Sequence, residues 1–341
     1  MVYDFDENVM LKKQQMKKDI KRTAGKCAMI LLMLSISTYL IGSIIMHVLK
    51  LRCIVSGIDI SIGNESEMIL GISKDAYNFW VGYFPCILAD IVAIFACTII
   101  FKKRVKSYIK IKKELSPAFI ACGAAASIGV GIISSIIFLI YSIIIHSQGL
   151  EIPSPDFSIP QSSIYLVLFM SYTCLIAPVF EEIIFRGYIL NNLRKYGNLT
   201  AIIVSSIFFS MFHFNLVQLV NPILMGIILS FIVIKSESII PSIIVHMFNN
   251  MMAMLTTVIS STDSQTIIIT WSGIYYMFGI SAFIYFILRY GREFLNVISE
   301  KRKLLQVRKK VLYCFFSKWT VAYILFYAFI VILTMTAKNI K

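Results

Sequence analysis

The chain has 341 residues, of which 58% are apolar and only 15% are charged, and its mean hydropathy is +0.81. This composition cannot cover the surface of a soluble globule of that length, so it excludes a soluble enzyme and predicts that lipid is the solvent. The formal net charge of +14 could indicate nucleic-acid binding, but the basic residues are interleaved with apolar segments, so we expect no nucleic-acid partner.

Apolar runs recur from one end of the chain to the other, and a bilayer crossing needs roughly 20 such residues. We predict an all-α, polytopic membrane helix bundle with about nine transmembrane helices. The predicted segments are 27–49, 79–101, 118–146, 162–190, 200–220, 222–235, 239–257, 267–288 and 319–337. The sixth segment is short, and the fourth is too long for one straight crossing.

Lys and Arg are distributed unevenly about these segments. If the N-terminus is cytoplasmic and all the segments cross, the basic residues outside are only Lys50, Arg52, Lys74, Lys338 and Lys341, out of 32. The positive-inside rule expects such an asymmetry. We therefore predict a multi-pass integral protein of the plasma membrane, with the N-terminus in the cytoplasm and the C-terminus outside.

Four parts of the chain differ in character. Residues 1–26 form a basic cytoplasmic tail, 27–158 an N-terminal block of three helices, 159–257 a compact block, and 258–341 a two-helix tail with a basic cytoplasmic loop. The first part is longer than the basic region of a secretory signal, so we expect an uncleaved signal anchor. The seven cysteines contain no C-x-x-C pair, which indicates buried apolar side chains rather than disulfides or a thiolate metal site.

Carboxylates and imidazoles inside apolar segments are candidates for function, because an Asp at the centre of a membrane helix costs about 2.5 to 3.5 kcal/mol. The candidates, in chain order, are Asp90, Glu181, Glu182, His213, His246, Asn249 and Asn250. Asp90 has no evident partner in the sequence and is interpreted as structural. His47 and His146 lie at segment ends, where a hydrated histidine costs little, and are also interpreted as structural.

The fourth segment contains two adjacent glutamates shortly after a proline. Pro178 is expected to break or kink the helix and to place both glutamates in the first turn of a new one, where the positive helix end favours carboxylates. Adjacent side chains point about 100° apart, so the two carboxylates cannot do the same job. Arg186 follows Glu182 at the spacing of an intrahelical ion pair, which leaves Glu181 free for chemistry.

The candidates are also predicted to lie at one depth. Gly197 marks the turn between the fourth and fifth segments, and Glu181 and His213 lie equally far from it along the chain. An antiparallel helical hairpin would therefore place them level. His246 and Asn250 share one face of the seventh segment at i, i+4, although Asn249 also lies close to that face. All these groups can converge in the cytoplasmic half of the membrane.

Three motifs in this order resemble the signature of the CPBP family of membrane proteins, which includes the CAAX-type and bacteriocin-processing proteases, also called Abi proteins. They are Glu181-Glu182-x-x-x-Arg186, Phe209-x-x-x-His213 and His246-x-x-x-Asn250. The resemblance covers roughly residues 160–255, so the compact block 159–257 is interpreted as a CPBP-like protease core. It implies hydrolysis of a peptide bond within the membrane, at a site reached from the cytoplasm.

The resemblance also implies roles for these residues. Glu181 would be the general base that activates water, His213 would hold that water, His246 and Asn250 would support the oxyanion, and Glu182 with Arg186 would brace the site. An alternative makes Glu181, His213 and His246 ligands of a divalent metal, possibly Zn²⁺. The sequence contains no HExxH motif and does not choose between a metal-free and a metal-dependent mechanism.

The predicted function is therefore that of an intramembrane endopeptidase, acting on a membrane-associated peptide or protein with or without a lipid anchor. A catalytically silent scaffold or bacteriocin-immunity protein is the alternative from another class. A proton-coupled transporter is a third reading, but the chain lacks the internal repeats with paired broken helices that are typical of transporters.

Overall fold

The structure is a computed structural model that describes residues 2–58, 68–109, 116–155, 158–299 and 304–339. Its long helices are α1 (Val2–Val55), α3 (Phe84–Phe101), α5 (Pro117–His146), α11 (Ile240–Ser260), α12 (Gln265–Ile298) and α14 (Lys318–Asn339). Shorter apolar helices are α9 (Asn198–Met211) and α10 (Val220–Ser236). The remaining short elements are α2 (Lys74–Tyr77), η1 (Asn78–Tyr83), α4 (Lys106–Ile109), α13 (Val307–Phe315), and a hairpin of β1 (Met68–Ile69) and β2 (Ile72–Ser73).

Between α5 and α9 the chain is helical from Ser163 to Tyr196. This stretch, called here the site helix, consists of α6 (Ser163–Ser171), η2 (Tyr172–Ile176), α7 (Ala177–Glu182), η3 (Ile183–Leu190), α8 (Asn191–Leu193) and η4 (Arg194–Tyr196). Two of its pieces, η2 and η3, have the wider π-helical register. The site helix is therefore long but irregular.

The predicted all-α membrane bundle is confirmed. In the described part of the chain, seven helices are long and apolar enough to cross a membrane, and they match seven of the nine predicted segments. The other two predicted segments correspond to α9 and α10, which are apolar but shorter. The chain is a multi-pass integral membrane protein, while a count of nine crossings and the division into four parts stay predictions.

The fifth predicted segment, 200–220, is not one helix. Helix α9 ends at Met211, and residues 212–219 turn back toward α10. Asn215 organises this turn, because its side chain donates to the His213 carbonyl and accepts from the backbone N–H of Gln218. Hydropathy does not reveal this reversal, because residues 212–220 stay mostly apolar and only His213, Asn215 and Gln218 are polar.

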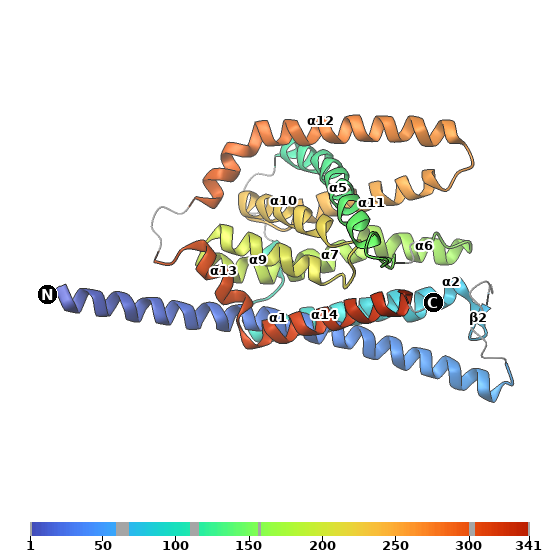
Figure 1. Ribbon diagram of the computed structural model, residues 1–341, viewed down its shortest axis with the longest axis horizontal. Coiled ribbons are helices and arrows are strands. Elements are labelled where there is room, and N and C mark those ends of the chain that lie inside the picture. Colours follow the sequence, from blue (N-terminus) through green and yellow to red (C-terminus); the bar gives the residue numbers. More distant parts are fainter. Residues whose placement is uncertain (1, 59–67, 110–115, 156–157, 300–303, 340–341) are drawn as a thin grey trace.

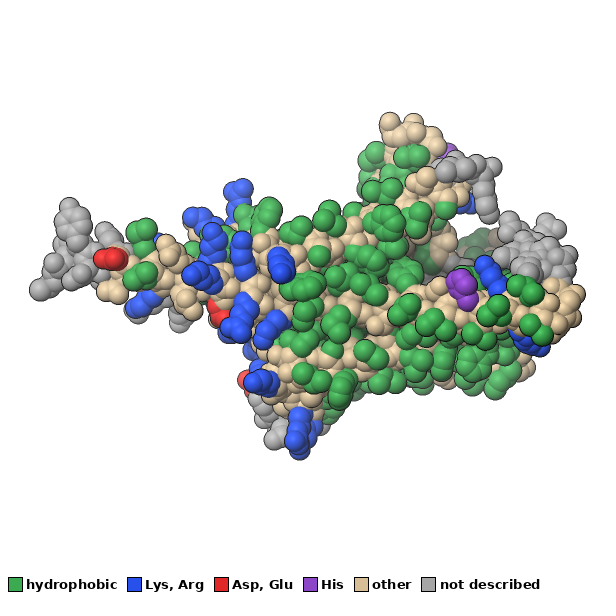
Figure 2. All heavy atoms as spheres, turned by 90° about the horizontal axis from the view of Figure 1, so that it is seen from below, with side chains coloured by type: hydrophobic (Ala, Val, Ile, Leu, Met, Phe, Trp, Pro, Cys, Tyr) green, Lys and Arg blue, Asp and Glu red, His purple; other side chains and the backbone are tan. Residues whose placement is uncertain are grey.

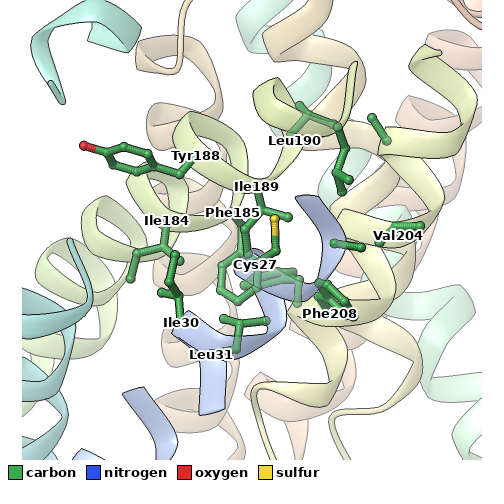
Figure 3. Packing of buried hydrophobic residues seen from close by; sticks show 14 of the residues in the cluster. Cys27, Ile30, Leu31, Ile184, Phe185, Tyr188, Ile189, Leu190, Val204 and Phe208 are labelled. Atoms are coloured by element: carbon green, nitrogen blue, oxygen red, sulfur yellow. The ribbon is translucent and has the colours of Figure 1, made fainter. Parts of the chain in front are cut away.

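The site helix and α9 lie in the middle of the bundle (Figure 1). On one side, α5 packs against α10, α11 and α12; on the other, α1 packs against α3, α13 and α14. Figure 3 shows the centre of this packing, where Cys27, Ile30 and Leu31 of α1 meet Ile184, Phe185 and Tyr188 of η3 and Val204 and Phe208 of α9. The N-terminal helix thus helps to hold the site helix in place.

Charge is segregated along the bundle. Figure 2 shows most of the visible Lys and Arg side chains gathered toward the end that carries the start of α1, with an apolar surface beside them. This separation matches the basic asymmetry of the sequence and places the basic end at one membrane face. That this face is cytoplasmic stays a prediction.

Candidate active site

The site helix passes Pro178 without a break, which corrects the expectation of a new helix starting near that residue. Pro178 lies inside α7, so Glu181 and Glu182 are in the helix interior rather than in a first turn. The π register of η2 directly before it explains how this is possible. A proline clashes with the carbonyl one α-turn earlier, and a widened turn moves that carbonyl away.

The π register leaves one backbone carbonyl without its helical partner. The N–H of Ala177 bonds to the Tyr172 carbonyl, so the next donor in this register would be residue 178, which is a proline. The orphaned group is the Thr173 carbonyl, and the Asn250 side-chain amide donates to it at 2.9 Å. Asn249 in turn donates to Asn250 Oδ1 at 3.3 Å. Both asparagines therefore take part, with Asn250 linking α11 to the site helix.

Glu182 and Arg186 form the predicted intrahelical ion pair. Arg186 Nη1 lies 2.8 Å from Glu182 Oε1, and both side chains are fully buried. The guanidinium also stacks on the Phe209 ring of α9, with 4.3 Å between its carbon and the ring centre. Because a buried charge without a partner is costly, this pair depends on both members.

His246 lies between the two glutamates and is also buried. Its Nδ1 is 3.1 Å from Glu182 Oε1, and its Nε2 is 3.6 Å from Glu181 Oε2. A carboxylate accepts, so Nδ1–H donates to Glu182, and Nε2 of a neutral ring is left with its lone pair toward Glu181. The Glu182 and Arg186 pair therefore fixes the orientation of the imidazole that faces Glu181.

His213 approaches from α9. It lies just past the last residue of that helix, and its Nδ1–H donates to the Phe209 carbonyl at 2.8 Å. The Phe209 ring makes edge contacts with both histidine rings, at 5.2 Å to His213 and 5.7 Å to His246 between ring centres. The structure thus brings His213 to the same aromatic residue as His246, and its Nε2 is left free of this backbone bond.

The residue after His213 is strained. Phe214 has a φ of 51°, in the left-handed region that aromatic residues rarely occupy. Its ring is held by edge contacts with Tyr39 of α1 and with Tyr323 and Phe326 of α14. Helices α1 and α14 therefore stabilise the turn that carries His213. The sequence motifs do not include these helices, so they could not predict this role.

Asp90 is closer to the site than the sequence suggested. It is buried on α3, at 2% exposure, and it interacts electrostatically with Glu181 and with Tyr172 of η2. One of its carboxylate oxygens has no hydrogen-bond partner among the described residues. The sequence marked Asp90 as unusual because it lies inside an apolar segment. No sequence pattern indicated that Glu181 would be its neighbour.

The exposure of the two glutamates differs. The Glu181 side chain is 13% exposed, whereas Glu182 is not exposed at all. Two hollows flank α11: a cavity of about 380 Å³ lined in part by Gln218, Asn221 and Asn249, and an apolar groove of about 490 Å³ between η2 and Met251 and Met252. Glu181 is thus the accessible member of the pair.

A zinc-dependent site would need its three candidate ligands to surround one point. Glu181, His213 and His246 are a chemically suitable zinc set. Within the residues that the structure describes, however, no group of three or more His, Cys, Asp or Glu side chains is placed to hold a metal ion. In this arrangement, Glu181, His213 and His246 do not surround one point as zinc ligands would.

Residues 163–252 match the family described as Type II CAAX prenyl endopeptidase Rce1-like. The matched region contains all three motifs and confirms the resemblance: the chain carries a domain of this CPBP-type family of membrane endopeptidases. The match covers about a quarter of the chain. Neither the curated proteins nor the solved structures give a match.

Proposed function

We propose that this protein is an intramembrane endopeptidase in which Glu181 and His246 together activate a water molecule. The observation that carries the proposal is the position of His246, with one ring nitrogen on the buried Glu182 and the other facing the accessible Glu181. A carboxylate and an imidazole 3.6 Å apart can both contact the same water molecule, as a general acid–base pair must. The Rce1-like domain supports peptide-bond hydrolysis as the reaction.

The proposed chemistry follows from these contacts. Glu181 takes a proton from the water, whose oxygen attacks the carbonyl carbon of the scissile peptide bond. The bond to nitrogen then breaks, and the proton passes to the departing amine. His246 Nε2 accepts a hydrogen bond from the same water. His213 faces the site from across Phe209, and with its Nδ1–H bonded to the Phe209 carbonyl its Nε2 is a second acceptor for water.

This assignment differs from the roles implied by the family resemblance in two respects. His246 rather than His213 is the partner of Glu181, since it is His246 that lies 3.6 Å from that carboxylate. Asn250 acts first as a positioning residue, because its amide is bonded to the Thr173 carbonyl. Its second N–H is the part that could assist the oxyanion.

The substrate is proposed to be a membrane-associated peptide or protein, with or without a lipid anchor. The apolar groove beside η2 supports this, since it suits an apolar chain. The cavity beside Asn249 has a mixed lining, in which Gln218, Asn221 and Asn249 offer side-chain amides to a peptide backbone. With the basic end of the bundle in the cytoplasm, cleavage would take place in the cytoplasmic half of the plasma membrane. The C-terminus would then lie outside.

Sequencing of new peptide N-termini in membrane fractions tests this function. Cells that make the intact protein are compared with cells that make Glu181→Gln, and Glu7→Gln, an exposed glutamate in the basic tail, serves as the matched control. New N-termini that need Glu181 but not Glu7 identify substrates. Identical peptides in all three samples would leave a silent scaffold as the better description.

A separate experiment decides the mechanism. The metal-free reaction predicts that purified protein cleaves its substrate after exhaustive treatment with chelator, and that elemental analysis finds less than one zinc per chain. Stoichiometric zinc, whose removal abolishes cleavage and whose return restores it, would show that Glu181 is a ligand rather than the base.

A further inference from the structure

A pocket of about 770 Å³ lies at the basic end of the bundle, well away from the active site. Its cationic lining consists of Lys102, Lys103, Arg104, Lys106 and Arg194, and we call it the basic pocket. Arg194 follows Glu181 on the same continuous helix, by a distance of roughly 15 to 20 Å at the usual helical rise. The basic pocket is therefore a separate site.

Among the described residues, the positive charge of this pocket is offset only in part. Glu237 is the one carboxylate among the described lining residues, and it interacts electrostatically with Arg194. In the part of the chain that the structure describes, none of the five cations forms an ion pair. Five like charges around one concavity repel each other, and an anion relieves that repulsion.

Arg194 is oriented but left charged. Its Nη1 donates to Asn191 Oδ1 at 3.2 Å, and its Nε donates to Asn198 Oδ1 at 3.3 Å. Both acceptors are neutral amides, so they hold the guanidinium without cancelling its charge. Its remaining N–H groups are the ones suited to paired contacts with phosphate oxygens.

The segment that carries the lysines is attached to the site helix and to α11. The Tyr188 hydroxyl donates to the Lys103 carbonyl at 2.9 Å, and the Ile239 N–H donates to the Tyr108 carbonyl at 3.3 Å. The first turn of the 21-residue helix α11 follows Ile239 directly, so its positive end lies at the wall of the pocket. The cations are thus presented by a fixed backbone around the concavity.

We propose that the basic pocket binds a phosphate group, supplied by the headgroup of an anionic membrane lipid. Three apolar helices meet there, because α3 ends at Phe101, α10 ends at Ser236 and α11 starts at Ile240. A site where membrane helices end is at headgroup depth, where lipid phosphates are concentrated. The proposal rests on charge and position alone and does not depend on the peptidase activity.

The test uses the full chain purified in a neutral detergent. Binding of dioctanoyl phosphatidylglycerol, dioctanoyl phosphatidylcholine and inorganic phosphate is measured for the intact protein, for Lys103→Gln/Arg194→Gln, and for Lys12→Gln/Lys309→Gln. The last pair lies on exposed faces outside the pocket and removes the same charge. If the first double variant does not fold, Lys102→Gln/Lys106→Gln replaces it, since these side chains are exposed.

The proposal predicts that phosphatidylglycerol binds more tightly than phosphatidylcholine, and that the pocket variant weakens its binding by about tenfold or more, which is about 1.4 kcal/mol. The control variant should change it less than about twofold. A third outcome is that inorganic phosphate binds with the same affinity as phosphatidylglycerol and competes with it. That result would support a phosphate site, but its ligand would be a free anion and the lipid source would be wrong. Equal weakening by both variants, or equal binding of the two lipids, overturns the proposal.

Discussion

Two parts of the bundle differ in regularity. Helices α5 and α12 form a regular pair, whereas the block from the site helix to α11 is irregular. Helices α5 and α12 are α-helical throughout, and they approach closely where Gly129 faces Gly279: a Cβ on Gly129 would lie 2.4 Å from the Gly279 carbonyl oxygen. The block that carries the polar residues contains two π segments, an internal proline and a helix that stops at Met211.

The difference teaches where chemistry can be placed in an apolar bundle. Regular helices satisfy their own backbone groups, so α5 and α12 need only small side chains to pack. Each irregularity of the other block leaves a group that a polar side chain must satisfy, as Asn250 does for Thr173. The same polar side chains and turns then position Glu181, His213 and His246.

The largest effect on stability is expected from breaking the buried ion pair. Glu182→Gln or Arg186→Met leaves an uncompensated charge in the bundle and should cost about 3 to 5 kcal/mol, seen as a low folded yield and a lower Tm in detergent. The double variant Glu182→Met/Arg186→Met should recover part of the Tm. Single variants as stable as the intact protein would show that the pair does not brace the site.

A smaller effect, on rate alone, is expected at His246. His246→Asn keeps a donor near Glu182 but removes the nitrogen that faces Glu181. Cleavage should slow by about 10² to 10³, while the Tm shifts by only a few degrees. Rate and Tm measured on one preparation check this, and a variant that cleaves at the normal rate would remove His246 from the reaction.

A further effect on stability is expected where α5 packs against α12. Gly129→Ala should cost about 1 to 3 kcal/mol, because its new methyl group meets the α12 backbone. Gly273→Ala, on α12 with open space around it, should be neutral or stabilising by up to about 1 kcal/mol. Both should keep normal cleavage per folded molecule, and a rate defect in Gly129→Ala at full folding would couple this pair to the chemistry.

An effect of similar size is expected at the π segment. Asn250→Ala leaves the Thr173 carbonyl unsatisfied and should cost about 1 to 3 kcal/mol. Pro178→Ala restores an N–H that can reach this carbonyl, so the double variant should lose less stability than the two single losses added together. A double-mutant cycle of Tm values measures this coupling, and simple additivity would refute the assignment of the orphaned carbonyl.

Much of this arrangement was predictable from the sequence. Long apolar runs predicted the helices, and spacing alone predicted the Glu182 and Arg186 pair, because both depend on contacts within one helix. Glu181 and His246 were predicted to lie close together because they lie at a similar depth on neighbouring helices, and they do.

Other features depend on contacts between distant segments, which periodicity does not encode. The π register around Pro178 depends on Asn250 of another helix, and the turn at His213 depends on contacts of Phe214 with α1 and α14. The proximity of Asp90 to Glu181 likewise needs the packing of α3 against the site helix.

The central claim is that two adjacent glutamates divide the work, with Glu181 chemical and Glu182 structural. It is tested most directly by measuring cleavage and Tm on the same purified preparations of Glu181→Gln and Glu182→Gln. The account predicts that Glu181→Gln keeps its Tm and loses cleavage by about 10² to 10⁴, the range for a general base. It predicts that Glu182→Gln loses Tm by many degrees. Normal cleavage by Glu181→Gln, or equal losses of Tm in both variants, would contradict it.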